Sequence, residues 1–323
     1  MNENILRFVG NSSQLCSAVR SQVIEGRAAG TRLIHVSNGC LSFVLDETHA
    51  LDIVQLWHEG VNVSFVSRNG LFTGEGDFAQ RFPAGMLYTC GLDATGVVEG
   101  HPVHGRFHSL PAEIRELRAD ESGVKIVATI RDTALFGSNL VMTRTVETAA
   151  GSGVLTVTDE LVNKAFVATE YAMLYHVNVG YPFADAGSRI EADIAETVPR
   201  TPWSREHQAT MLEVEPPADG MNEFCYFHTL RRPEVSLVNP RLGRKLTLSW
   251  SGETLPKFVE WKSRASGDFA IGLEPATCWL DEHFARKPLA SGERVVNKLT
   301  LALQEAAFCV PSKNLTVQVV PRG

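Results

Sequence analysis

The stretch HPVHGRFHS, residues 101–109, brings three histidines and an arginine together within eight positions. Imidazole and guanidinium groups can ligate a metal, bind nucleic acid or hydrogen-bond a small ligand. Pro102 and Gly105 disfavour a helix in this stretch, so we expect an extended chain or loop.

An extended chain would divide the histidines between two faces. His104 and His108 would share one face, and His101 would point the other way. This argues against a metal site built from all three, although a zinc site could recruit His176 from elsewhere. We therefore expect no bound metal, and we take His104 and Arg106 as candidate ligand-binding residues.

A second polar interruption lies in MLYHVNVGYP, residues 173–182. On a strand, His176 and Asn178 share one face while Tyr175 and Val177 occupy the other. Two buried polar side chains need partners, which a ligand can supply. The alternative is that both groups are satisfied by the protein itself.

A carboxylate candidate lies in FAIGLEP, residues 269–275, where Glu274 follows an apolar run at the end of a strand. A carboxyl group that loses water there has a raised pKa, which suits a general base. The alternative is a glutamate that faces solvent. The nearby Trp261 would either stack on a sugar ring or pack in the core.

Two further side chains are weaker candidates for ligand binding. Arg81, beside Phe82 and Pro83, offers a planar fork of donors for hydroxyl groups or a carboxylate, unless it is an ordinary surface arginine. His228 interrupts the aromatic stretch EFCYFHTL, where the sequence offers no evident partner for it.

Short β-type segments must position these residues. Alternation of apolar and polar residues, with β-branched side chains, predicts strands throughout the chain. They are residues 31–37, 41–46, 50–57, 61–67, 123–130, 139–148, 153–163, 173–180, 235–240, 245–251, 258–263, 269–275, 296–304 and 315–320. One short helix is expected near residues 11–25. The pattern predicts an all-β protein in which residues 1–323 form one large antiparallel β-sandwich domain, with residues 1–30 as a lead-in.

The composition disfavours two classes of partner. A net charge of −7 and a pI near 5.8 disfavour nucleic acid and anionic membranes as partners. No signal peptide or long apolar run is apparent, and six scattered cysteines suggest reduced thiols in the cytoplasm. We expect a small-molecule partner and a monomer or homodimer.

Several motifs together resemble the aldose 1-epimerase (galactose mutarotase-like) superfamily, and most closely its bacterial DUF4432 branch. They are FVGNSSQL at 8–15, ALDI at 50–53, GMLYTCGLD at 85–93, VHGR at 103–106, LYHVNVGYP at 174–182, LVNP at 237–240, FVEWK at 258–262 and GLEPAT at 272–277. THALDI at 48–53 departs from the Arg-Gly-Met-Asp-Ile expected there. The resemblance implies a β-supersandwich fold of large antiparallel sheets.

The resemblance also implies roles for individual residues in a sugar site on a concave sheet face. His104 looks like the substrate-binding histidine, His176 like the general acid and Glu274 like the general base, while Arg81 would contact sugar hydroxyls. The base takes the anomeric proton and the acid protonates the ring oxygen, so the ring opens and recloses as the other anomer. This chemistry requires no cofactor. The HGR motif at 104–106 differs from the His-Gly-Gly of galactose mutarotases.

Other functions remain open on the sequence alone. A catalytically silent carbohydrate-binding or sensor protein would keep Arg81, His104 and Trp261 without needing Glu274 as a base. A metal-dependent sugar isomerase or lyase would use the histidines. A two-carboxylate glycosidase is least favoured, because Glu274 has no obvious partner carboxylate.

Overall fold

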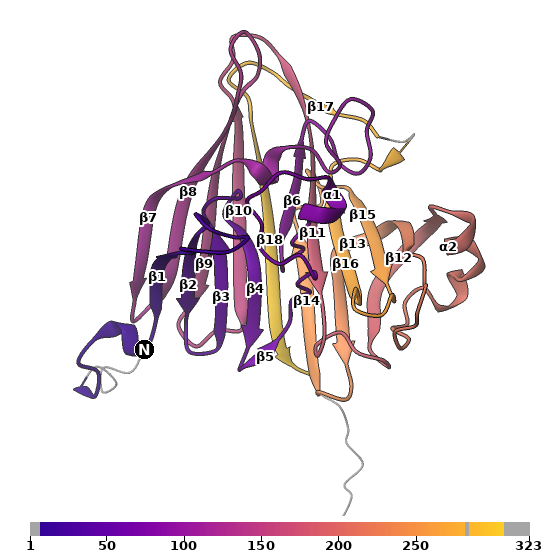
Figure 1. The fold of residues 1–323 in the computed structure, drawn as a ribbon, viewed down its shortest axis with the longest axis horizontal. Coiled ribbons are helices and arrows are strands. Elements are labelled where there is room, and N and C mark those ends of the chain that lie inside the picture. Colours follow the sequence, from indigo (N-terminus) through magenta and orange to yellow (C-terminus); the bar gives the residue numbers. More distant parts are fainter. Residues whose placement is uncertain (1–6, 282–283, 307–323) are drawn as a thin grey trace, which may run out of the picture.

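The computed structural model describes residues 7–281 and 284–306, and nearly all of its regular structure is β (Figure 1). The strands of the first half are β1 Ser17–Gln22, β2 Arg32–Ser37, β3 Leu41–Asp46, β4 Asp52–His58, β5 Val61–Asn62, β6 Tyr88–Leu92, β7 Ala112–Asp120, β8 Gly123–Thr133, β9 Asn139–Ala149 and β10 Val154–Asn163. Those of the second half are β11 Thr169–Val179, β12 Arg189–Pro199, β13 Phe224–Asn239, β14 Arg244–Trp250, β15 Lys257–Ser263, β16 Ala270–Ala276, β17 Lys287–Leu289 and β18 Arg294–Glu305. Two short α-helices are α1 Phe78–Arg81 and α2 Pro202–Glu206. The expected all-β class is confirmed.

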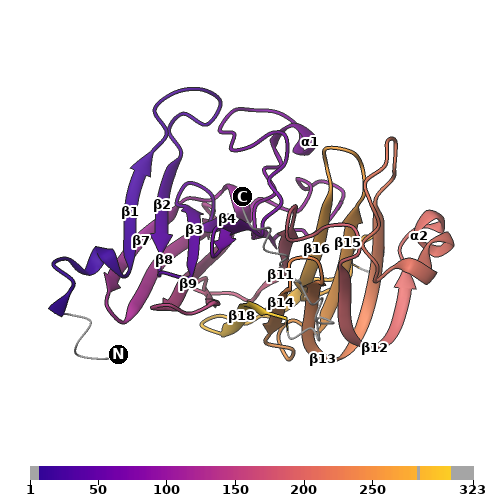
Figure 2. The same cartoon turned by 90° about the horizontal axis from the view of Figure 1, so that it is seen from below.

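The strands form two antiparallel sheets. A five-stranded sheet has the order β1-β2-β3-β4-β5. A thirteen-stranded sheet has the order β17-β11-β16-β15-β13-β14-β18-β10-β9-β8-β7, with β6 added beside β11 and β12 beside β13. Figure 2 shows the five-stranded sheet lying against β7, β8 and β9, while α1 lies over β11, β15 and β16.

The 16-residue strand β13 belongs to two parts of the large sheet. Residues Phe224–His228 pair with β15, and residues Glu234–Asn239 pair with β14. The sheet thereby passes from β15 to β14 along β13, and both sheets contribute buried Leu, Ile, Val and Phe side chains to a common hydrophobic core. Burial of this apolar surface is the main force that stabilises the sandwich.

Most sequence-predicted strands are present, but the N-terminal lead-in is not helical beyond one turn. A 3₁₀ helix at Ser12–Gln14, capped by Asn11, is followed directly by β1, which pairs with β2 along its whole length. The prediction of a helix at 11–25 is therefore wrong, because pairing with a neighbouring strand overrides local helix propensity. The predicted strand at 315–320 and residues 1–6 of the lead-in lie outside the described residues.

Cys16, Cys40, Cys90, Cys225 and Cys278 are free thiols, and Cys309 lies outside the described residues. Within residues 7–281 and 284–306, none of the helices has the length and apolar character needed to cross a membrane.

Candidate functional site

Strand register brings His176 and Glu274 side by side. In β11 and β16, Leu174 pairs with Ala276 and Val177 with Leu273, so His176 lies opposite Glu274 between those two pairs. The alternation along each strand sends Tyr175, Val177 and Leu273 into the core and leaves His176 and Glu274 on the opposite face. Two β-strands, rather than a loop, thus hold both groups.

The pair is buried, and neither group is fully satisfied by the protein. His176 Nε2 lies 3.2 Å from Glu274 Oε1, and the two side chains are 5% and 2% exposed. Within the described residues, His176 Nδ1 and Glu274 Oε1 have no hydrogen-bond partner. Both atoms do have polar neighbours, since Oε1 faces His176 Nε2 and the Asn178 side chain raises the pKa of His176, but the geometry falls short of full hydrogen bonds.

Burial moves the two pKa values in opposite directions. Loss of water, and then the charge of Glu223, raise the pKa of Glu274 well above its usual value, which Arg200 partly offsets. Loss of water, and then the neighbouring His104, lower the pKa of His176 well below its usual value. Desolvation disfavours the charged form of either group, so burial favours the neutral form of both side chains.

Gly272 makes room for the carboxylate. A Cβ atom at this position would lie 2.6 Å from Glu274 Oε1 and 3.1 Å from the Trp261 side chain. Gly272 also stands between Asn178 on β11 and Trp261 on β15 in the sheet register. A glycine therefore lets the Glu274 carboxylate and the Trp261 indole occupy the same face.

His104 reaches the same region from a loop. It has a positive φ of 63°, and it is followed by Gly105, where a Cβ would lie 2.5 Å from the carbonyl oxygen of Gly91. The Gly96 N–H donates to His104 Nδ1 over 3.2 Å, which places the ring proton on Nε2. Burial, and then the charge of Arg200, lower the pKa of His104 to about 4, so the neutral ring offers an Nε2–H donor. Its ring centre lies 5.6 Å from that of His176.

These three side chains line a cavity of about 380 Å³, and aromatic rings complete its wall. The rings are Phe65, Phe78, Phe82 and Trp261. The Trp261 Nε1–H donates to Glu223 Oε2 over 2.8 Å, which fixes the orientation of the indole. A cavity of this size with aromatic faces and a few fixed polar groups is typical of a small-molecule site.

Arg200 and Glu223, which also line this cavity, were not predicted from the sequence. Arg200, which follows β12, donates from Nε and Nη2 to the two Asp281 oxygens over 2.6 and 2.9 Å. Its Nη1 lies 3.5 Å from Glu223 Oε1. The only usable signal would have been the charges that flank β12 and β13, since neither residue belongs to a recognisable motif.

Two of the predicted ligand-binding residues do not line the cavity. The buried Asn178 amide donates to the carbonyl oxygens of Gly85 and His176, each over 3.0 Å, and so braces the backbone. His228 lies on the other face of β13, where it bonds Glu260 over 2.9 Å and Thr197 over 2.9 Å. Partners within the protein, rather than a ligand, satisfy His228.

The stretch 101–109 is a compact loop rather than an extended strand. Gly105 and a 3₁₀ helix at Phe107–Ser109 separate His104 from His108, so the expectation that they share a face is wrong. Arg106 does not line the cavity, because it forms ion pairs with Asp132 and Asp93.

His101 lies outside the cavity as well. Its Nδ1 is 3.2 Å from Asp93 and its Nε2 is 2.9 Å from Arg286. In the described part of the chain, the one group with metal-ligand spacing is Cys40, His58 and Glu59, which includes none of the histidines of this loop. In that group, His58 Nδ1 already accepts a hydrogen bond from the neighbouring Arg244 over 2.9 Å.

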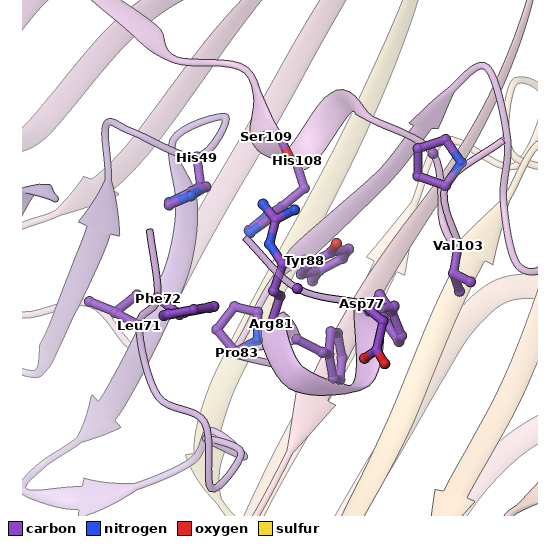
Figure 3. A pocket seen from close by; sticks show the side chains of 15 residues that line it. His49, Leu71, Phe72, Asp77, Arg81, Pro83, Tyr88, Val103, His108 and Ser109 are labelled. Carbon is purple, nitrogen blue, oxygen red and sulfur yellow. The ribbon is translucent and has the colours of Figure 1, made fainter. Parts of the chain in front are cut away.

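Arg81, the predicted contact for sugar hydroxyls, lies at the end of α1 and lines a neighbouring pocket instead of the cavity (Figure 3). The two hollows adjoin, since Phe78, Phe82 and Val103 line both.

Several solved structures that share this fold are named as aldose 1-epimerases or mutarotase-like proteins. A Klebsiella pneumoniae protein provisionally assigned as an aldose 1-epimerase is 19% identical over 92% of this chain and 87% of its own, with a TM-score of 0.81. A galactose mutarotase-like protein from Clostridium acetobutylicum is 12% identical over 90% of this chain and 99% of its own, with a TM-score of 0.67. A search among curated proteins finds no match.

The fold is therefore galactose mutarotase-like, as the sequence motifs implied. Residues 28–295 match the family described as a domain of unknown function, DUF4432. The chain belongs to the DUF4432 family.

Proposed function

We propose that the protein is an aldose 1-epimerase that interconverts the anomers of a sugar bound in the 380 Å³ cavity. The observation that carries this proposal is the buried Glu274–His176 pair, whose facing atoms lie 3.2 Å apart. Burial favours the neutral forms of both groups, and in that form of the pair the one transferable proton lies on Glu274.

That proton can occupy either partner without changing the net charge of the pair. When it moves to His176, Glu274 becomes the base that takes the proton from the anomeric hydroxyl. His176 then gives its proton to the ring oxygen, the C1–O bond to the ring breaks, and the open-chain aldehyde forms. Rotation about C1–C2 and the reverse transfers close the ring as the other anomer. Each positioned acid or base contributes about 10²–10⁴-fold to such a step.

The other cavity residues fit the binding of a sugar ring. The Nε2–H of His104 can donate to a sugar oxygen, and the Trp261 indole offers a flat face for the apolar side of a pyranose. Arg200 and Arg68, which line the cavity, are ion-paired with Asp281 and Asp268. This charge balance favours an uncharged aldose over an anionic one.

Magnetisation-exchange NMR on a panel of neutral and acidic aldoses tests the proposal. We expect the wild type to accelerate anomer exchange, and Glu274→Gln to lower the exchange rate by at least about 10²-fold while still binding sugar. Glu253→Gln, the same change at an exposed residue, serves as the control.

If the Glu274→Gln variant accelerates anomer exchange at the wild-type rate, Glu274 is ruled out as the base. Sugar binding by the wild type without acceleration of any aldose would instead identify a carbohydrate-binding protein that lacks catalysis.

A further inference from the structure

A second pocket of about 290 Å³ lies beside the cavity, between the 66–84 segment, the 102–109 loop and the turn after β3. Figure 3 shows Arg81, Tyr88 and His108 converging there from α1, β6 and the 3₁₀ helix, with His49 opposite. The pocket is separated from the cavity by little more than one ring. Tyr88 stacks on His108 at 3.9 Å between centroids, and its ring centre lies 6.2 Å from that of His104 in the cavity.

Several polar groups of this pocket lack partners in the protein, although Asp77 accepts from the Gln80 N–H as the N-cap of α1. Among the described residues, the Arg81 guanidinium forms no ion pair, and the hydroxyls of Tyr88 and Ser109 form no hydrogen bond. His49 and His108 use only Nδ1, so their Nε2 atoms are also without partners. By contrast, Arg68 and Arg200, which line the Glu274 cavity, are both ion-paired.

Buried carboxylates fix the two imidazoles in place. His108 Nδ1 lies 2.7 Å from Asp52, which also accepts from Thr89 and from the fully buried Arg144. His49 Nδ1 lies 2.7 Å from the buried Asp46, and the two rings stack at 5.0 Å. Each carboxylate engages Nδ1, which leaves Nε2 of each ring free to bond a ligand hydroxyl.

The chemistry of the lining selects the class of ligand. Arg81 and the Tyr88 hydroxyl can donate hydrogen bonds to a ligand, whereas unprotonated imidazole Nε2 atoms and the Asp77 carboxylate can accept them. Each hydroxyl of a sugar both donates and accepts, so it needs both kinds of neighbour. An anion needs donors alone. The negative charge of Asp77 balances the positive charge of Arg81, so the lining does not favour an anion. Phe72, Phe78 and Phe82 supply apolar faces for a ring.

We propose that the pocket lined by Arg81, Tyr88, His49 and His108 is a second carbohydrate subsite that binds one uncharged, hexose-sized unit. This goes beyond the proposed mutarotation, which needs only the Glu274 cavity. The unit is either a free sugar or the next residue of an oligosaccharide whose reducing end occupies that cavity. Its recognition chemistry is the same in both cases.

Histidine ring signals in ¹H–¹³C NMR spectra report on this subsite directly. We would titrate the wild type with glucose, galactose, lactose and inorganic phosphate, and follow His49 and His108. We expect sugars to shift both signals in the wild type and in Glu274→Gln. Tyr88→Phe, which keeps the ring, and Arg81→Met should each weaken this binding about tenfold, as expected for loss of a hydrogen bond to a bound ligand. Arg115→Met, an exposed arginine on β7, is the matched control.

The outcomes separate the sources and can overturn the proposal. Shifts with glucose or galactose identify a free second sugar, and shifts with lactose alone identify the next unit of a glycoside. Three results would overturn the subsite. They are no shift with any sugar, shifts with phosphate alone, and a sugar affinity in Tyr88→Phe and Arg81→Met that equals that of the wild type. The readout does not involve anomer exchange, so failure of the mutarotase proposal and failure of this one are distinguishable.

Discussion

At the residue scale, the three central side chains share an unusual condition, which is that ionisable groups are kept neutral by burial. His104, His176 and Glu274 lie on one cavity wall, and the protein offers them few charged partners. Any of the three groups becomes charged only when a proton moves between it and another group of the site or a ligand. The same burial makes the stability of the fold depend on pH at these positions.

Glu274 makes the folded state less stable as pH rises. Its folded pKa is well above the unfolded value, so its stabilising contribution is complete below about pH 4.5 and is lost as pH rises toward the folded pKa. We expect Glu274→Gln to gain free energy of unfolding relative to the wild type between pH 5 and pH 8. Urea denaturation at both pH values measures this difference. An unchanged difference would mean that Glu274 is ionised in the folded protein.

His104 acts in the opposite direction. Its folded pKa of about 4 lies below the unfolded value of 6.5, so its stabilising contribution is complete above pH 6.5 and is lost as pH falls toward 4. His104→Gln should therefore be less sensitive to acid than the wild type, by about 3 kcal/mol between pH 7 and pH 4. Thermal melts across this range, with His35→Gln as an exposed control, test the prediction.

At the scale of elements, adjacent strands set the positions of the chemical groups, and one glycine sets their spacing. We expect Gly272→Ala to displace the Glu274 carboxylate, because the new Cβ would lie 2.6 Å from its Oε1. The cost should be about 1–3 kcal/mol of stability, as for other over-packed sites, together with at least a tenfold loss of anomer exchange. Gly10→Ala, where a Cβ would meet nothing within 4 Å, is the control. Exchange NMR and urea denaturation should be run on the same samples.

Strand alternation was enough to predict that His176 lies on a polar face, because the two-residue repeat is a local property. It could not reveal that Asn178 on the same face turns its amide to the backbone, since Gly85 is distant in sequence. Loop geometry was predicted less well. The positive φ values at His104 and Gly105 break the extended chain, and the ion pair of Arg106 depends on a partner, Asp132, in another strand.

At the scale of the whole molecule, Arg144 ties the two sheets together. It is fully buried on β9 and bonds Asp159 on β10, Asp52 on β4 and Thr89 on β6. Arg144→Leu leaves two buried carboxylates without their cation, so we expect a loss of about 3–5 kcal/mol in the free energy of unfolding. Arg118→Leu, at an exposed ion pair on β7, should cost less than about 1 kcal/mol. Equal losses in the two variants would show that Arg144 does not join the sheets energetically.

The separation between strands and loops has a consequence for how such proteins can diversify. Glu274 and His176 belong to paired strands whose register is fixed by a common core, whereas His104, Arg81 and the aromatic wall formed by Phe78 and Phe82 belong to connecting segments. Exchange of residues 66–84 and 93–109 between relatives is therefore expected to leave the strand-held Glu274–His176 pair in place. Under the proposed function, a transplanted loop should change which sugar the cavity accepts and should not move this pair, so specificity can be redesigned in the loops alone.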